Sequence, residues 1–575
     1  IEEVVAKLKV QATDAAESAG VPDTLYEALY ARLRSSPDAV PVAEAAAVIG
    51  GRVERSLLHA VIDMSERDVD RVIQELVDAR VLDPLDENTW RFRHDLLRDV
   101  AAELSPPSHC RRLHGRVADT LLAAAAEGNP DWQVIANHYE QAERYTEAAT
   151  AYREASDDAR LRGALNEART YLTNAVSQVE RAIAGADRDH LEVALRLQRG
   201  FLAYAAEGAS SANAAADYKR CLEISGSRLR DDEFFSTLVA LYGYFAMRAD
   251  LDRVERLLAS VRSSLVGSRE WFRPFNDAGF GMLAWYRGDF TNARELLEAA
   301  ALARSDESAQ ELDAVWFMPN EGTASIYTHL ALARYIQGDL AGAEAELKRT
   351  EHRCESIGFP QGVFSFAYAR QMEVLIRIEA GQLDRALEVA TALGTNGAQH
   401  GFDSWAMVGA AQQETVAALA ALNGNPLDIA QLQRHIATLT SYVDAWRALA
   451  VRSLITFYDA VLARLLIAAG RLDQARDRIQ IALQLADETG MHFYDAELLR
   501  IRAHSTDDPG ARRADISDAI ELARSQGALV FELRSALEYF ALEGEPGRDA
   551  LLDVVSRFPA DISWPQLTHA RALLA

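Results

Sequence analysis

The chain has 575 residues, with 60 Lys and Arg against 86 Asp and Glu, so its formal net charge at pH 7 is −26. Binding to nucleic acid or to an anionic membrane depends on an excess of basic side chains, so neither partner is expected. No apolar run is long enough to span a bilayer, no signal peptide is recognisable, and the three cysteines lack the spacing of a disulfide framework. These features suit a protein of the reducing cytoplasm.

The first 128 residues combine short helices with a predicted hairpin. Helices are predicted at residues 24–33, 42–49, 57–62 and 65–79, with two more beginning at Asp95 and Ser108. Ser65 and Asp68 resemble a capping box at the start of the fourth helix. A polar turn at residues 86–89 separates two short apolar runs, which indicates a hairpin over residues 81–94. Helices followed by a hairpin describe a winged helix, so we assign residues 21–128 to such a domain.

A short phrase, Gly-x-(Leu/Phe)-x-x-Ala, recurs between helical stretches in the rest of the chain. Its glycine can end one helix in a left-handed conformation, a neighbouring Asp, Asn or Thr can cap the next helix, and the small Ala permits close packing of the pair. The glycines of the phrase are Gly163, Gly288, Gly338, Gly381 and Gly470. Two looser versions occur, one with Ala249 in place of the glycine and one at residues 145–148.

The apolar residues of this phrase mark a repeat of helix pairs. Four consecutive marks are Leu251, Phe290, Leu340 and Leu383. They are 39 to 50 residues apart, longer than the common tetratricopeptide unit of about 34 residues. A further pair is expected in the unmarked residues 404–439. We therefore predict an all-α fold, with a right-handed superhelix of tetratricopeptide-like helix pairs over residues 129–575, in which each pair packs only against its neighbours.

Aromatic side chains recur near the start of the first helix in each pair. First helices line the concave side of such superhelices, so these rings could face a groove. The candidate groove residues are Trp271, Trp316, Trp405 and Trp446. One interpretation is that the rings fill the core between repeats. The alternative is a groove for a ligand or peptide, because aromatic anchors in a concave site suit recognition.

Six segments before residue 125 share their pattern with one protein family, at residues 21–25, 31–33, 45–50, 76–82, 92–99 and 111–114. They resemble the winged-helix part of bacterial STAND-type signalling ATPases. That family includes large LuxR-type regulators, the maltose-regulon activator, and actinobacterial nucleotidyl cyclases fused to an ATPase and helical repeats. Residues 1–20 look like the final helix of the family's ATPase module, and the repeats resemble the family in architecture only.

The resemblance also implies a role for His94. In that family the winged helix closes over bound ADP, and a histidine in a (Met/Arg)-His-Asp phrase reaches the phosphates; residues 93–95 match the phrase. A helix N-terminus favours anions, although His94 could equally bond to backbone at the strand–helix junction. The chain contains no Gly-x-x-x-x-Gly-Lys-(Ser/Thr) loop, so ADP or ATP is expected only where an attached or partner ATPase module is present.

The sequence carries no motif of a hydrolase, a metalloprotease or a dinucleotide-binding enzyme, so we expect no catalytic residue, no metal and no cofactor of the chain's own. The leading hypothesis is a non-catalytic sensor region of a STAND-type signalling or transcription-regulatory protein. Its repeats would bind a small-molecule or protein effector, and its winged helix would relay occupancy to the ATPase module. The alternative is a protein-interaction scaffold without switching. An enclosed apolar pocket favours the small effector, and a long open groove favours a protein partner.

Overall fold

The computed structural model describes Leu33 and residues 36–125, 130–208, 211–224, 231–304, 316–317, 320–560, 562 and 564–575. The terminal helix predicted at residues 1–20 lies outside the described residues, as does the helix predicted at residues 24–33 apart from Leu33. The chain divides into two compact units. One comprises residues 1–158 and 170–188, and the other comprises residues 159–169 and 189–575.

The first unit opens with short helices around a small antiparallel sheet. Its helices up to residue 141 are α3 (Ala39–Ile49), α4 (Arg55–Val61), α5 (Glu66–Asp78), α6 (Asp95–Leu104), α7 (Pro107–Ala124) and α8 (Trp132–Gln141). The strand order is β1–β3–β2, with β1 at Val53–Glu54, β2 at Leu82–Pro84 and β3 at Thr89–Phe92. Leu82 pairs with Phe92, which confirms the predicted hairpin. β1 was not predicted, because two residues carry no alternation pattern.

The fourth predicted helix, α5, begins as its sequence indicates. The Ser65 hydroxyl oxygen accepts a hydrogen bond from the Asp68 amide at 3.2 Å, and the hydroxyl donates to the Asp68 carboxylate at 2.6 Å. Val69, Ile73 and Leu76, which share one face of this helix, are buried in the core of this unit. The helices and the hairpin are those on which the winged-helix interpretation rests, and that interpretation stays a prediction.

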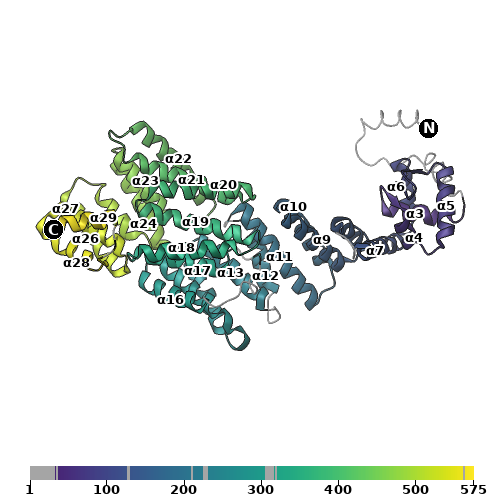
Figure 1. Cartoon of the computed structure of the whole chain (residues 1–575), viewed down its shortest axis with the longest axis horizontal. Coiled ribbons are helices and arrows are strands. Elements are labelled where there is room, and N and C mark those ends of the chain that lie inside the picture. Colours follow the sequence, from purple (N-terminus) through teal and green to yellow (C-terminus); the bar gives the residue numbers. More distant parts are fainter. Residues whose placement is uncertain are drawn as a thin grey trace. The chain divides into compact units, whose positions relative to one another are not determined.

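The rest of the chain is built from successive helices arranged in pairs (Figure 1). The helices that follow α8 are α9 (Tyr145–Leu161), α10 (Leu165–Arg181), α11 (Ala186–Glu207), α12 (Ala212–Ile224), α13 (Asp231–Met247), α14 (Leu251–Ser264), α15 (Arg273–Tyr286), α16 (Phe290–Ala303), α17 (Gly322–Ile336), α18 (Leu340–Glu355), α19 (Gln361–Glu379), α20 (Leu383–Gln399), α21 (Asp403–Ala421), α22 (Ile429–Ala448), α23 (Ile455–Ala468), α24 (Leu472–Thr489), α25 (Asp495–Ala503), α26 (Pro509–Gln526), α27 (Leu529–Glu543), α28 (Glu545–Ser556) and α29 (Pro565–Leu574). The fold is thus the predicted array of tetratricopeptide-like helix pairs, and α21 and α22 form the pair expected in the unmarked stretch.

The recurrent phrase sets where the second helix of each marked pair begins. The helices α10, α14, α16, α18, α20 and α24 each start on the apolar residue of the phrase. The preceding glycines have positive φ, between 72° and 86°, and Ala249 takes the same left-handed conformation at 57°. The alanines three residues into the helices are fully buried: Ala168, Ala293, Ala343, Ala386 and Ala475. The roles assigned to the glycine and to the alanine of the phrase are therefore confirmed.

The residue after the glycine caps the following helix, as predicted, where that residue is aspartate. Asp289 accepts from the Asn292 amide at 3.2 Å, and Asp339 accepts from the Gly342 amide at 2.8 Å. The equivalent Gln382 and Arg471 make no such bond, because their side chains are not short acceptors.

Helix ends about 200 residues apart meet in the second unit. The Ser404 hydroxyl, at the start of α21, donates to the Ala205 carbonyl near the end of α11 at 3.0 Å, a separation of 199 residues. The amides of Arg452 and Ser453, just before α23, donate to the carbonyl of Met247 at the end of α13, at 2.9 and 3.1 Å. In the same way, the amide of Phe493 before α25 donates to the carbonyl of Tyr286 at the end of α15. The first helices α11, α13 and α15 thus each meet the first helix five pairs later, so the expectation that each pair packs only against its neighbours is wrong in this unit.

Close packing within a pair generates a test. The backbone of Gly281 in α15 lies so near α16 that a Cβ there would be 3.2 Å from the Ala293 carbonyl oxygen. We expect Ala293→Leu to lower the free energy of unfolding by about 1–3 kcal/mol, because the added atoms have no space. Ala299 lies exposed on the same helix, so Ala299→Leu is the matched control and should change stability by less than about 0.5 kcal/mol. Urea denaturation measures both, and equal effects would contradict this packing.

An apolar cavity among the first helices

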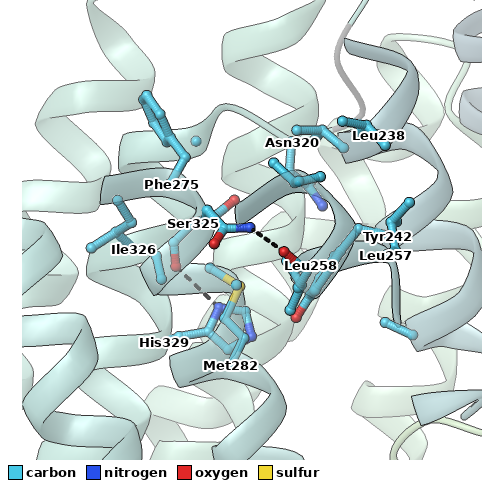
Figure 2. Close-up of a pocket in the computed structure, with 18 of the residues that line it drawn as sticks. Leu238, Tyr242, Leu257, Leu258, Phe275, Met282, Asn320, Ser325, Ile326 and His329 are labelled. Atoms are coloured by element: carbon cyan, nitrogen blue, oxygen red, sulfur yellow. Dashed lines mark hydrogen bonds between the residues drawn. The ribbon is translucent and has the colours of Figure 1, made fainter. Parts of the chain in front are cut away.

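A largely apolar cavity lies among the helices of the second unit. Its volume, measured as the space open to the centre of a water molecule, is about 110 Å³. A single water occupies roughly 10–15 Å³ by this measure, so the space fits a small organic ligand. Its walls come mainly from α13, α14, α15 and α17, with Tyr204 of α11 and Tyr368 of α19. Figure 2 shows Tyr242 and Leu257 on one side of this space and Ile326 and His329 on the other.

The sequence explains why these helices enclose a cavity. α17 is apolar around most of its circumference and most of its residues are buried, as expected of a helix surrounded by others. Glycines then bring neighbouring elements close at the edges of the space. A Cβ on Gly279 would lie 2.6 Å from the Leu258 side chain, and one on Gly322 would lie 2.4 Å from the Phe275 ring.

Three polar atoms in the cavity wall have no protein partner within the described part of the chain. They are Asn276 Oδ1, Asn320 Oδ1 and the Tyr242 hydroxyl. Asn276 is only 1% exposed, and its Nδ2 donates to the Leu258 carbonyl at 3.0 Å, a bond marked in Figure 2. Because a carbonyl cannot donate, this bond fixes the amide orientation and leaves Oδ1 as a buried acceptor. Such an acceptor suits a ligand that carries a hydrogen-bond donor.

His329 contributes a neutral imidazole to the wall. Its Nδ1 lies 3.0 Å from the Ser325 carbonyl oxygen, which can only accept, so Nδ1 carries the proton. Its Nε2 therefore accepts from the Tyr368 hydroxyl at 3.1 Å. Burial lowers the pKa of His329 to about 4, and the bond to Ser325 only partly opposes this effect. The ring is uncharged at neutral pH.

The described residues contribute no Asp, Glu, Lys or Arg side chain to the cavity wall. An ionised ligand would lose its hydration here without a counter-charge, which is costly. The wall consists of aliphatic and aromatic groups with a few hydroxyl, amide and imidazole groups. This chemistry fits an uncharged, largely apolar ligand with one or two hydrogen-bonding groups.

A second cavity adjoins the first and shares three of its lining residues, Tyr204, Met247 and Tyr368. Its volume, measured in the same way as for the first cavity, is about 80 Å³. Two of the tryptophans selected from the sequence, Trp405 and Trp446, line this second cavity, and each is 7% exposed.

The other two selected tryptophans line neither cavity. Trp271 is 45% exposed and meets Phe235 and Phe272 edge-on, with ring centroids 5.5 Å apart in both pairs. Trp316 is half-buried, and the guanidinium of Arg160 lies over its ring at 4.4 Å. The four rings therefore do not form one surface.

Sequence reasoning missed the polar residues of the first cavity. Asn276 and His329 belong to no motif or recurring pattern, so no spacing singled them out. The available signal was the apolar character of residues 322–336 on every side, which indicates a helix surrounded by others.

His94 lies at the junction of the β2–β3 hairpin and α6, where it is the N-cap residue of that helix. Its side chain is exposed and does not cap the helix. The phosphate-contacting role that the family resemblance gives it stays a prediction.

None of the described helices is both long and apolar enough to cross a bilayer. Within the same residues, no group of three or more His, Cys, Asp or Glu side chains is arranged to hold a metal ion.

Comparison with known proteins finds no family model that matches the chain. An uncharacterized protein of Rhizobium meliloti is 24% identical over 525 residues, which cover 88% of this chain and 49% of that protein. The chain therefore spans about half the length of the curated relative it matches.

Solved structures with a similar arrangement share little sequence with the chain. A Rap protein complexed with competence and sporulation factor has 12% identity and a TM-score of 0.40, covering 67% of this chain and 96% of that one. A STAND protein with a tetratricopeptide repeat sensor from Pyrococcus horikoshii has 13% identity and a TM-score of 0.28, covering 94% and 65%. Yeast Tom70 has 15% identity and a TM-score of 0.30, covering 80% and 95%. At these values the likenesses say nothing about function.

The buried imidazole predicts a pH dependence of stability. An exposed histidine has a pKa near 6.5, so the unfolded chain takes up this proton before the folded chain does as the pH falls. The stability that neutral His329 provides is complete above about pH 6.5 and declines as the pH falls toward 4. Between pH 7 and pH 5 we expect this group to cost about 2 kcal/mol of unfolding free energy.

Urea denaturation at the two pH values measures this loss. In His329→Gln the drop in stability from pH 7 to pH 5 should be smaller than in the unmodified chain by that amount. His569→Gln, at an exposed histidine, should leave the drop unchanged. An identical drop in the chain and in His329→Gln would show that His329 is not held neutral.

Proposed function

We propose that this chain is an effector-binding region whose helix array takes up a small, uncharged, largely apolar molecule in the first cavity. The observation that carries the proposal is an apolar space to whose wall the described residues contribute unpaired hydrogen-bonding atoms and no ionised side chain. A scaffold for a protein partner would need no such space, because proteins bind helix arrays through exposed surfaces. The scaffold remains the second candidate, supported by the exposed ring of Trp271.

The wider proposal places this region in a signalling protein of the STAND type. It rests on the resemblance of residues 21–128 to the winged helix of that family and on the repeat array that follows. The winged helix would pass the state of the array to an ATPase module, attached or separate, and His94 would contact the nucleotide there. The chain itself would be non-catalytic and would act in the cytoplasm.

The cavity lies where binding could alter the array. Met247 and Tyr286 line the cavity, and their carbonyls accept the hydrogen bonds from the helix ends five pairs later. A ligand that packs against these residues would stabilise one separation between the helices that meet here over another. A ligand shifts a conformational equilibrium only through such differential contacts.

The ligand class can be tested with a matched pair of dyes. N-phenyl-1-naphthylamine is uncharged, and 1-anilinonaphthalene-8-sulfonate adds a sulfonate to the same ring system. We expect saturable fluorescence enhancement with the uncharged dye and at least about tenfold weaker binding of the sulfonate, because the wall offers no cation.

Gly243 provides the variant that fills the cavity. It lines the space, and a Cβ there would meet nothing within 4 Å, so Gly243→Leu should fold and lower the affinity for the uncharged dye at least about tenfold. Ala259→Leu, on the exposed face of α14, is the control and should bind normally. Equal binding by both variants, or a preference for the sulfonate, would refute an uncharged ligand in this cavity.

Amide hydrogen exchange tests the link between binding and the array. Exchange at Arg452, Ser453 and Phe493 should slow when the uncharged dye is bound, because these amides donate to carbonyls of cavity residues. In Gly243→Leu the dye should have no effect on them. Binding without any change at these three amides would contradict the relay while leaving the cavity as a binding site.

A further inference from the structure

The second cavity differs from the first in its chemistry. Five aromatic side chains line it: Tyr204, Tyr368, Trp405, Trp446 and Tyr458. They belong to five different helices of the array, α11, α19, α21, α22 and α23. The rings of Trp446 and Tyr458 are 4.9 Å apart, and those of Tyr368 and Trp405 are 6.4 Å apart, so the rings of each pair are neighbours. All five rings border the same small space.

One ionisable side chain borders this cavity among the described residues. Glu207 is the only Asp, Glu, Lys, Arg or His that this part of the chain contributes to the wall. Its carboxylate accepts from the Ser211 hydroxyl at 2.6 Å and pairs with Arg169 at 2.7 Å. Burial raises the pKa of Glu207, but these bonds and the Arg169 charge outweigh it and keep the pKa below the usual range. Arg169 offsets much of the Glu207 charge, so any attraction for a cation comes mainly from the ring faces.

We propose that the second cavity binds an organic cation of the methylated-ammonium class, held by the faces of Trp405, Trp446 and Tyr458. Aromatic faces carry negative electrostatic potential and attract such cations, whose methyl groups also pack well against rings. A primary ammonium would need hydrogen-bond acceptors to replace its water, whereas a methylated ammonium does not. The site goes beyond the uncharged ligand proposed for the first cavity.

The two cavities have part of their walls in common. Met247 separates the cavities together with Tyr204 and Tyr368, and its thioether accepts from the Ser453 hydroxyl at 3.3 Å. Methionine side chains are flexible and adapt to neighbouring ligands. One molecule with an apolar body and a methylated-ammonium end could therefore occupy both cavities.

Choline and 3,3-dimethylbutan-1-ol test the second site, because they have nearly the same shape and differ in charge. Titration calorimetry with the full chain, at constant ionic strength, should give choline at least about fivefold tighter binding than the neutral alcohol. Equal affinities, tighter binding of the alcohol, or no binding of choline at millimolar concentration would overturn the proposal.

Variants locate the binding. Trp446→Leu and Trp405→Leu should each abolish the preference for choline, and Trp271→Leu should preserve it, because Trp271 lines neither cavity. Circular dichroism shows whether each variant folds, and the comparison of the two probes on the unmodified chain stands without them. A folded Trp446→Leu with an unchanged preference would place the cation elsewhere and refute the site. Loss of choline binding with normal binding of the uncharged dye would refute this site alone and leave the proposed function intact.

Discussion

The helix array turns back so that helices five pairs apart meet, and both cavities depend on this return. The ends of α11, α13 and α15 meet the starts of α21, α23 and α25, through hydrogen bonds such as Ser404 to Ala205 and Phe493 to Tyr286. An array that did not return would present its first helices to water. Their apolar faces are instead turned toward one another, and the space that side chains do not fill becomes two adjoining cavities.

Further along the chain, ion pairs stabilise contacts between helices of different pairs. Arg534 of α27 lies 2.5 Å from Glu379 at the end of α19 and 3.2 Å from Glu497 of α25. Burial raises the pKa of Glu497, but the nearby Arg500 and Arg534 outweigh it and hold the pKa below the usual range. These buried charges are paired, as buried charges must be. The residues described in the wall of the first cavity carry no charge, so the two regions differ sharply in what they can bind.

The sequence predicts the local parts of this structure well. The phrase with Gly288, Phe290 and Ala293 locates a helix end, a helix start and a packing contact, because each depends on neighbouring residues alone. The return after about 200 residues depends on small rotations added over five helix pairs, which no single residue encodes. The sequence places Trp405 and Trp446 near the start of first helices, which holds for Trp405 in α21, whereas Trp446 lies near the end of the second helix α22. Tyr204 and Met247, which complete their cavity, come from helices that meet them only because of that rotation. His329 and Asn276 could not be selected, because their partners Tyr368 and Leu258 come from neighbouring helices.

The contact between α11 and α21 can be tested most directly by an engineered disulfide. A Cβ on Gly208 would lie 3.4 Å from the Cβ of Ser404, close to the separation of about 3.5–4.5 Å found in disulfides. Mild oxidation of the Gly208→Cys/Ser404→Cys double variant should give an intramolecular cross-link, detected by mass spectrometry of its peptides and absent from either single variant. If the double variant stays reduced, or links only between chains, the array does not return upon itself there and the enclosed cavities lose their basis.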